Sequence, residues 1–523
     1  MPGRKRPRIF DSSSSDSDVV ASAKESLQVD QAAPAQATAR IVAPMAVKGE
    51  TAAPDTCGAG ISSSSAPQSV APPWPAFIRE ALAGPLNYLG RQARPLLVTT
   101  AFSGLASIMQ ALKDLQISAR ELAAAEPKPS AQTFCRSNNL LAEHHFLDVR
   151  DLTKTGFGKC IRHGDCKMPE ERADLLVMGF PCQPYSAQRT GSDDADNVRQ
   201  HECFQYGHEA VRFILKTRPR SGLLENVMKF DTDHKGASTP FDHDMVNFCD
   251  NLCDDLRANN FHTKKIYLDL NPWVNANSLR IYIFFVDGDI GPESVVLQAA
   301  ELAQLVQDRR KQHAPTTLLS LCLSPASPQW SRESMRLLEE RAPNHEQEED
   351  PDARWKKQAE RLRELRGWKG QPWTDPESGA APPQLRGLSK TCRIKEITNL
   401  GFFWAAARLG LDPHNVAHRS AVVSQLTCDP TQNPCRQPWG TKLHRITRRT
   451  RPYIYEKDRC MFPWEAYRIY GWENPCLDDL KDGEAWDLLG DSMALQTLGV
   501  AASALICSLG ERLPGLWHSH GLA

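Results

Sequence analysis

Short apolar runs separated by longer, helix-like stretches dominate the chain from about residue 90 onward. Apolar runs occur at 96–98, 174–178, 222–224 and 281–286, and helical patterns such as 207–216 lie between them. Apolar strands that alternate with helices predict an α/β domain with a mainly parallel sheet, covered on both faces. Ligands of such sheets bind beyond the carboxyl ends of the strands, so functional residues are expected there.

Three segments depart from this pattern. Residues 1–75 are rich in Ser, Ala and Pro and predict a disordered tail, because few apolar side chains are present to offset the entropy cost of ordering. Residues 331–366 are strongly charged and predict an exposed helix and a linker within an insertion. The stretch 495–509 is apolar but shorter than the ~20 residues of a membrane span, so no membrane partner is expected.

The overall charge does not indicate a partner, but its distribution does. Lys+Arg of 62 against Asp+Glu of 63 gives a net charge of −1. Residues 436–451 nevertheless hold a basic patch with no acidic residue, which predicts phosphate contacts through Arg436, Lys442, Arg445, Arg448, Arg449 and Arg451. The bland interpretation of this patch is a solvated loop.

The cysteines and the N-terminus bear on the cellular compartment. The 15 cysteines are irregularly spaced and include no C-x-x-C pair, and no apolar signal segment follows the charged N-terminus. These features predict reduced thiols in the cytosol or the nucleus. The basic cluster Arg4, Lys5, Arg6 and Arg8 has the composition of a nuclear import signal or of a solvated tail. We expect a nuclear protein, and otherwise a cytoplasmic one.

A loosely metal-like spacing is found at Cys160, His163 and Cys166. No second pair lies nearby in the sequence to complete a tetrahedral site. We therefore expect no metal.

A candidate nucleophile follows the predicted strand at 174–178. The segment 179–186 reads Gly-Phe-Pro-Cys-Gln-Pro-Tyr-Ser, which puts Cys182 on a loop at the carboxyl edge of the sheet. Pro181 and Pro184 fix the backbone on both sides, so the thiol loses less entropy on attack. Pro-Cys-Gln alone is also compatible with a chance tripeptide.

A second motif at a strand end, Glu225-Asn226-Val227, argues against a chance occurrence of Pro-Cys-Gln. A thiolate and a carboxyl group on neighbouring strands suit attack on an electron-poor ring. The two motifs in this order resemble those of the cytosine-5 DNA methyltransferases, which carry their catalytic cysteine in Pro-Cys-Gln and their glutamate in Glu-Asn-Val. The resemblance covers residues 90–290 and 455–523. It implies the Rossmann-like, mostly parallel mixed sheet of class I methyltransferases and S-adenosyl-L-methionine as cofactor.

The same resemblance assigns further residues to the cofactor site. Phe102-Ser103-Gly104 matches the cofactor loop after the first strand, Glu126 matches the acceptor of the ribose hydroxyls, and Asp148 matches the acidic position near the adenine amino group. Gly490 and Ser492 match the closing motif, which helps to enclose the cofactor. A bland alternative for Glu126 and Asp148 is a merely solvated carboxylate.

Catalytic roles follow from the resemblance in the same way. Cys182 adds to carbon-6 of a flipped cytosine, Glu225 hydrogen-bonds nitrogen-3 and the amino group, and Arg280 holds the carbonyl oxygen. The alternative interpretation of Arg280 is that it only caps a strand edge. Asn226 is expected to orient the cysteine loop, which Pro181, Gln183, Pro184 and Ser186 form.

The chain also departs from the family pattern. Ala106 and Ser107 replace two glycines of the cofactor loop, Ala276 and Ser278 replace two target-base contacts, and Asp491 replaces Asn in the closing motif. These changes keep open a methyltransferase-like protein without turnover. An RNA cytosine methyltransferase is a second alternative, although the Cys-Phe-Thr signature of the tRNA-modifying branch does not occur.

The predicted organisation is a tail at 1–75, a catalytic domain at 90–290, a smaller inserted target-recognition region at 291–454, and a return to the catalytic domain at 455–523. The insert includes the basic patch, and residues 425–427 are expected near base edges. The predicted function is methyl transfer to carbon-5 of cytosine in DNA.

Overall fold

A computed structural model describes residues 73–85, 92–186, 194–235, 245–340, 354–369, 392–412, 423–425, 443, 446–448, 452–457 and 459–517. The N-terminal basic cluster and nearly all of the predicted tail lie outside these residues, as do Arg436, Lys442, Arg445, Arg449 and Arg451. What the sequence predicts for them stays a prediction.

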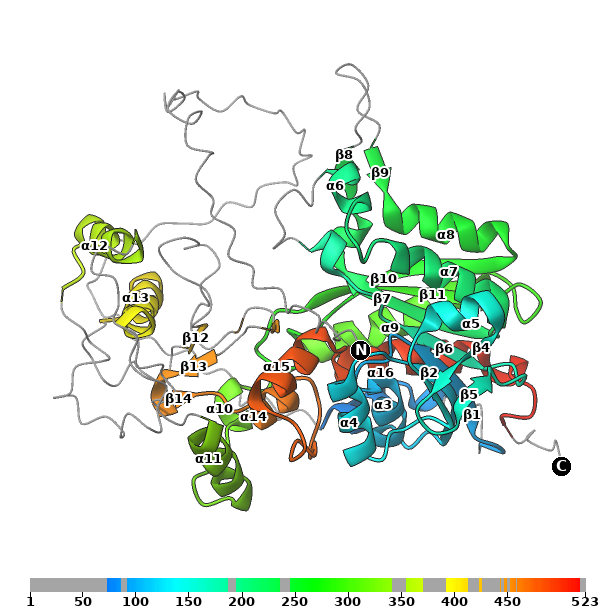
Figure 1. Ribbon diagram of the computed structural model, residues 1–523, viewed down its shortest axis with the longest axis horizontal. Coiled ribbons are helices and arrows are strands. Elements are labelled where there is room, and N and C mark those ends of the chain that lie inside the picture. Colours follow the sequence, from blue (N-terminus) through cyan, green and yellow to red (C-terminus); the bar gives the residue numbers. More distant parts are fainter. Residues whose placement is uncertain are drawn as a thin grey trace, which may run out of the picture. The chain divides into compact units, whose positions relative to one another are not determined.

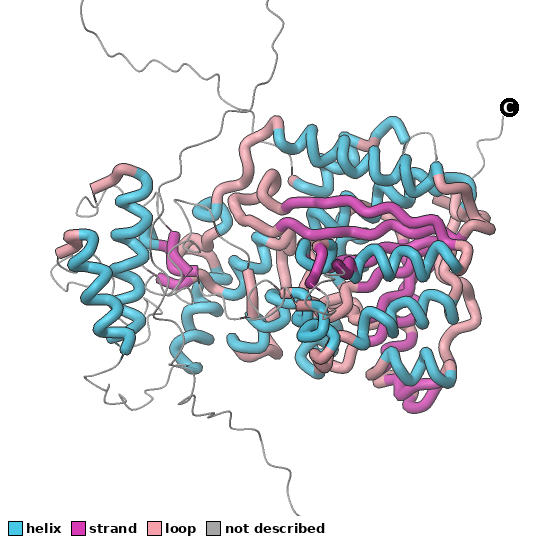
Figure 2. Tube along the Cα trace, turned by 90° about the horizontal axis from the view of Figure 1, so that it is seen from above, coloured by secondary structure: helices cyan, strands magenta, loops and turns pink. Residues whose placement is uncertain are grey.

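A nine-stranded mixed sheet forms the centre of the fold, in the order β10-β11-β7-β6-β1-β2-β3-β4-β5 (Figures 1 and 2). Its middle strands pair in parallel, and antiparallel strands extend both sides. The expected mostly parallel mixed sheet is confirmed. The strands are β1 (Leu96–Ala101), β2 (Ala119–Ala125), β3 (His144–Phe146), β4 (Phe157–Cys160), β5 (Gly164–Lys167), β6 (Leu175–Met178), β7 (Ser221–Val227), β10 (Phe261–Asp269) and β11 (Leu279–Asp287).

Helices cover both faces of this sheet with two separate apolar clusters (Figure 1). One cluster draws its side chains from α1 (Trp74–Ala81), α3 (Ser107–Asp114), α4 (Pro129–Ser137), α9 (Ser294–Lys311) and α16 (Leu495–Leu509). The other uses α5 (Val149–Thr155), α6 (Ala195–Arg199), α7 (Gln205–Thr217) and α8 (Phe248–Ala258). The central strands are apolar on both sides because neither of their faces meets water.

The apolar segment near the C-terminus belongs to the core. Every residue of α16 is buried. The stretch Asp482–Arg512 is long and apolar enough to cross a membrane by length and composition, but 94% of its most apolar window is buried inside the protein. A core helix passes the same test, so this stretch is weak evidence for a membrane span.

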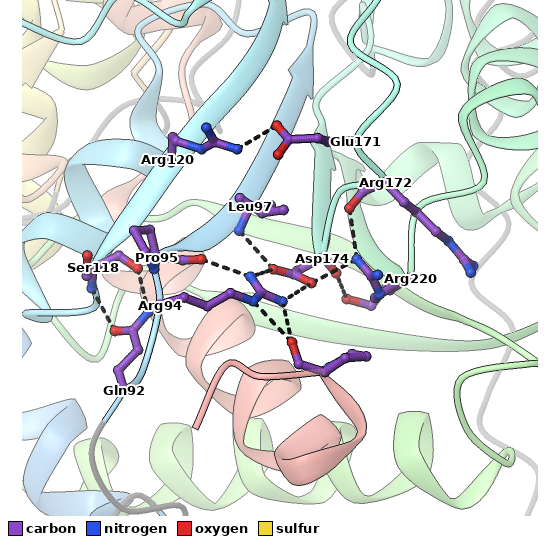
Figure 3. Close-up of polar contacts among 12 residues, drawn as sticks. Gln92, Arg94, Pro95, Leu97, Ser118, Arg120, Glu171, Arg172, Asp174 and Arg220 are labelled. Carbon is purple, nitrogen blue, oxygen red and sulfur yellow. Dashed lines mark hydrogen bonds and ion pairs between the residues drawn. The ribbon is translucent and has the colours of Figure 1, made fainter. Parts of the chain in front are cut away.

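A buried carboxylate stabilises the amino-terminal edge of the parallel strands (Figure 3). Asp174 is fully buried, and its two oxygens accept hydrogen bonds from Arg94 at 2.6 and 2.9 Å, from Arg220 at 3.1 Å and from the Leu97 amide at 2.9 Å. Arg94 also donates to the Pro514 carbonyl. This network ties β1, β6 and β7 to the C-terminal segment at the edge opposite to the expected active site.

The inserted region contains short helices and a small sheet. They are α10 (Leu318–Leu321), α11 (Pro328–Glu340), α12 (Arg354–Arg366), α13 (Cys392–Leu409), β12 (Val423–Gln425), β13 (Pro452–Ile454) and β14 (Arg459–Cys460). The segment predicted to be charged and helical, 331–366, thus contributes to α11 and α12. Because α9 packs against α16 and β10, we propose that the insert begins after Lys311 and not at residue 291.

The remaining described elements connect these parts. They are η1 (Gln183–Tyr185), η2 (Met228–Asp231), β8 (Asp233–Lys235), β9 (Met245–Asn247), η6 (Tyr455–Lys457), α14 (Pro463–Ile469), α15 (Asp482–Asp491) and η7 (Gly510–Arg512). Within α14, Glu465 forms a buried ion pair with Arg459 at 2.6 Å and accepts the Leu323 amide at 2.6 Å. This pair joins the return segment to α10.

Candidate active site

The loop that carries Cys182 follows β6 at the carboxyl edge of the sheet. Tyr185 in the short helix η1 is buried, and its ring lies 4.8 Å from that of Phe230 and 5.8 Å from that of Phe248. This aromatic anchor fixes one end of the loop. Cys182 precedes η1 and is only half-buried, so its thiol stays within reach of a substrate.

An ion pair between β7 and β11 lies beside this loop. Arg280 Nε is 2.8 Å from Glu225 Oε1, and the two side chains are 10% and 13% exposed. A Cβ on Gly179, at the start of the cysteine loop, would lie 3.4 Å from Glu225 Oε2. The start of the cysteine loop therefore lies directly beside the Glu225 carboxyl group.

The electrostatics of Arg280 connect it to the thiol. Burial alone would lower the pKa of Arg280, but the charges of Glu225, Tyr470 and Cys182 oppose this effect, and the pKa is raised. Arg280 thus stays cationic beside Glu225, with the Cys182 thiol close enough to interact with its charge. The structure brings together all three residues that the resemblance assigns to catalysis.

Asn226 links the glutamate strand to the cysteine loop. Its Nδ2 donates to the Phe180 carbonyl at 3.3 Å, and its Oδ1 accepts the Val227 amide at 2.8 Å. Asn226 is 2% exposed and therefore acts inside the protein as a positioning residue for the loop. In the cysteine loop, Gln183 Oε1 is buried and receives no donor from the described residues.

The cofactor loop between β1 and α3 has an unusual backbone. Phe102, Gly104 and Ala106 all have positive φ, at 53°, 52° and 53°. The loop is supported from beneath, because Ser103 Oγ lies 2.6 Å from Thr100 Oγ1, which in turn donates to Glu121 at 2.6 Å. A Cβ added at Gly104 would meet nothing within 4 Å, so open space adjoins this residue.

The two altered loop positions point away from that space. Ala106 and Ser107 are each 2% exposed, and Ala106 belongs to the apolar core on the α3 face. A side chain that lined an open site would be accessible to solvent. The side chains of Ala106 and Ser107, which replace the two glycines, therefore do not crowd the open side of the loop.

Glu126 supports the cofactor loop directly. Its carboxylate accepts the Gly104 amide at 2.8 Å and the Lys128 amide at 3.0 Å, and the residue is 8% exposed. Burial raises its pKa, and these two hydrogen bonds oppose the shift. Both oxygens retain capacity to accept further donors such as ribose hydroxyls.

Asp148 is the N-cap of α5. It accepts the Arg150 amide at 2.8 Å, and the Arg150 guanidinium forms a fork on the same carboxylate, with its shortest contact at 2.6 Å. Burial would raise the pKa of Asp148, but the hydrogen bonds from Arg150 outweigh it and the pKa is lowered. Arg150 also lies over Tyr206, whose ring meets that of Phe102 edge-on at 5.4 Å. Asp148 and Phe102 thus belong to one connected cluster.

The closing motif at the end of α15 contacts the basic segment of the insert. A Cβ on Gly490 would lie 2.2 Å from the Arg448 backbone nitrogen, so only glycine allows this approach. Asp491 accepts from Arg448 Nε at 2.6 Å and from Lys128 Nζ at 3.4 Å. Ser492 is buried and donates to the Leu489 carbonyl at 2.9 Å.

One residue of the basic patch has a partner within the protein. The sequence pattern predicts that Arg448 contacts DNA phosphates, whereas the structure pairs it with Asp491. Burial would lower the pKa of Arg448, but Asp491 and other nearby acidic groups, including Cys182, raise it. Sequence reasoning missed Lys128 at this site, because it belongs to no recognisable motif.

Comparisons with known proteins found a family match over part of the chain. Residues 98–268 match the family model of the C-5 cytosine-specific DNA methylase. Over 82 residues the chain is 35% identical to a type II methyltransferase, M1.ScrFI, of Lactococcus lactis subsp. cremoris. That alignment spans 14% of this chain and 19% of the relative, so the chain covers less than a fifth of it.

The match to the C-5 cytosine-specific DNA methylase family thus covers residues 98–268, about a third of the chain. Similar solved structures include the Entamoeba histolytica methyltransferase EhMeth, with 12% identity and a TM-score of 0.40, and the Dnmt2 methyltransferase of S. pombe, with 14% identity and a TM-score of 0.39. Each alignment covers 79% of this chain and 98% of the other.

Proposed function

We propose that this family member transfers a methyl group to carbon-5 of cytosine in DNA through a covalent bond to Cys182. The observation that carries this proposal is the convergence of Cys182 with the Glu225–Arg280 ion pair at one sheet edge. Arg280 Nε lies 2.8 Å from Glu225 Oε1 in that pair. A nucleophile, a carboxyl group and a rigid cation are the groups that addition to a cytosine ring requires.

The proposed chemistry follows from these positions. The Cys182 thiolate forms a bond to carbon-6, and the electron pair of the ring double bond moves toward carbon-5. Glu225 hydrogen-bonds nitrogen-3 and the amino group, while Arg280 holds the carbonyl oxygen. Carbon-5 then accepts a methyl group. Loss of the carbon-5 proton to solvent restores the double bond and breaks the bond to sulfur.

S-adenosyl-L-methionine supplies that methyl group when it is bound. Phe102, Ser103, Gly104, Glu126, Asp148, Gly490 and Ser492 would hold it. The open space at Gly104 and the burial of Ala106 and Ser107 support this fit. The pairing of Asp491 with Arg448 and Lys128 supports it further, because an unpaired Asp491 would repel the cofactor carboxylate.

DNA is favoured over RNA as the substrate by the sequence. The tRNA-branch signature Cys-Phe-Thr is absent, and the insert carries a basic patch suited to phosphates. RNA methylation is the second candidate. A protein that binds without turnover is less well supported, because the altered loop residues are buried and Asp491 has cationic partners.

The deciding experiment measures methyl transfer from labelled cofactor to DNA and to RNA side by side. We expect transfer to DNA, and a loss of at least about 10⁴-fold in Cys182→Ala with cofactor binding retained. Cys476→Ser, a half-buried thiol elsewhere, is the control. Transfer to RNA alone identifies the second candidate, and wild-type turnover in Cys182→Ala removes the thiol from the mechanism.

Covalent catalysis has its own test. DNA with 5-fluorocytosine should trap the protein in an adduct that survives denaturation, because fluorine cannot leave as the proton does. Turnover on ordinary DNA without any adduct on fluorinated DNA would contradict a bond to Cys182.

A further inference from the structure

Four potential metal ligands meet at the edge of the sheet formed by β3, β4 and β5. They are His144, Cys160, His163 and Cys166, and their ligand atoms all lie within 4.8 Å of one another. The sequence spacing relates only three of them and predicts no metal, because the fourth is not visible in it. His144 lies on β3, well upstream, and only the sheet pairing brings it to the other three.

The register of the strands explains this convergence. Cys160 pairs with Gly164 across the β4–β5 hairpin, and Cys166 pairs with Gly158, so the two cysteines lie on the same face. On the other side, Cys160 pairs with Phe146 of β3, whose ring stacks with that of His144. The period of two along each strand thus places three of the four ligands on one face, and His163 lies in the hairpin turn.

The distances within the cluster fit a tetrahedral ion. His144 Nδ1 lies 3.3 Å from Cys166 Sγ, and His163 Nδ1 lies 3.6 Å from Cys160 Sγ. Ligands bound tetrahedrally to zinc at about 2.0–2.3 Å lie about 3.3–3.8 Å apart. Both histidine–cysteine pairs already have this separation.

The surroundings of Cys160 favour a bound thiolate. The residue is 3% exposed, and its Sγ accepts the backbone amides of His145 at 3.3 Å and Arg162 at 3.4 Å. A neutral thiol is a weak acceptor, whereas hydrogen bonds of this kind orient and stabilise metal ligands.

The geometry points to a structural zinc site formed by His144, Cys160, His163 and Cys166. Two thiolates and two imidazoles in a tetrahedral arrangement select zinc, and four protein ligands leave no open position for catalysis. The site joins β3 to the β4–β5 hairpin. Strands β4 and β5 have four residues each and are largely exposed, so they bury little apolar surface. The free energy of metal binding would stabilise these strands in place of buried apolar contacts.

The test is elemental analysis of the full chain purified under reducing conditions. We expect about one zinc per chain, and loss of that zinc in Cys166→Ser and in His163→Asn, which change the more accessible ligands. Cys476→Ser, a thiol outside the cluster, should keep the metal. Zinc at wild-type stoichiometry in both ligand variants, or a disulfide between Cys160 and Cys166 in the reduced protein, would overturn the assignment.

A second measurement does not depend on how well the variants fold. Cobalt(II) added to wild-type protein after removal of zinc should produce the visible absorption of a tetrahedral thiolate site, and zinc should abolish it. A chelator should lower the midpoint of thermal unfolding, and added zinc should restore it. If the protein binds neither metal, even after zinc is supplied, there is no site.

Discussion

The two edges of the parallel strands contain the same chemical pair in different surroundings. At the amino edge, Asp174 is fully buried and receives four hydrogen bonds from Arg94, Arg220 and the Leu97 amide. At the carboxyl edge, Glu225 pairs with Arg280 beside the half-buried Cys182. Both sites hold a carboxylate and arginine out of water. Only the second places a nucleophile next to them.

The difference shows what converts an ion pair into a catalytic group. At the amino edge, donors from three residues enclose the carboxylate, and its contribution is to stability. At the carboxyl edge, the loop that begins at Gly179 beside Glu225 carries a half-buried thiol. Burial of charge is common to both edges, whereas a thiol within reach of a substrate distinguishes the site.

The largest expected effect separates activity from stability. Glu225→Gln should lower methyl transfer per folded molecule by about 10²–10⁴-fold, because the carboxyl group is removed from the ring nitrogen. Asp174→Asn should leave that activity unchanged but cost about 3 kcal/mol of stability, as expected for a broken buried pair. The cost lies at the low end because Arg94 and Arg220 keep 28% and 21% of their side-chain surface exposed.

Urea unfolding and methyl transfer measured on the same preparations check this contrast. Asp308→Asn, an exposed carboxylate on α9, is the control and should change neither quantity. If Asp174→Asn lost activity in its folded form, the two edges would not be functionally distinct.

The sequence predicted the central strands better than the edges. Strands β1, β6, β7 and β11 contain continuous apolar runs, which a sheet covered on both faces requires. Strand β2, with the sequence ARELAAA, lacks β-branched residues, and β3 to β5 are short and polar, so no pattern marked them. Tertiary pairing determines such strands more than local preference does.

In the candidate site, too, local motifs could be predicted from the sequence and long-range contacts could not. The motifs around Cys182 and Glu225 are local, and both could be placed at strand ends from the sequence. The contacts of Arg448 with Asp491 and of His144 with the cysteine hairpin join residues far apart in the chain. A single sequence does not contain the register that brings such residues together.

The next prediction concerns the basic patch. Arg445→Ala combined with Arg449→Ala should flatten the log–log dependence of DNA binding on salt by about 0.9 for each phosphate that is no longer neutralised. Arg448→Ala should leave the slope unchanged, because its guanidinium pairs with Asp491 at 2.6 Å in the protein itself. A flatter slope in Arg448→Ala would show that this arginine leaves Asp491 for phosphate.

A smaller effect on cofactor binding is expected in the cofactor loop, where substitution of Gly104 should matter more than substitution of Ala106. Gly104→Ala strains a residue at φ 52° and puts a methyl group into open space, so it should weaken cofactor binding roughly tenfold and cost about 1–2 kcal/mol of stability. Ala106→Gly relieves similar strain but removes a buried methyl group and adds backbone entropy. Ala106→Gly should leave the cofactor affinity, measured by calorimetry, and the free energy of unfolding nearly unchanged. A large gain in cofactor affinity for Ala106→Gly would mean that its methyl group does crowd the ligand.

The smallest effect is the coupling between Arg448 and Asp491, an exposed ion pair that contrasts with the buried pair at the amino edge. The two side chains are 50% and 30% exposed, whereas Asp174 is fully buried. Solvent screens an exposed pair, so a double-mutant cycle with Arg448→Ala and Asp491→Asn should give roughly 0.2–1 kcal/mol in cofactor affinity or stability. The matched cycle with Arg94→Ala and Asp174→Asn should give several times more. If the couplings were equal, burial would not be what makes the Arg94–Asp174 pair stronger than the Arg448–Asp491 pair, and Asp491 would contribute to the cofactor site as strongly as a buried residue does.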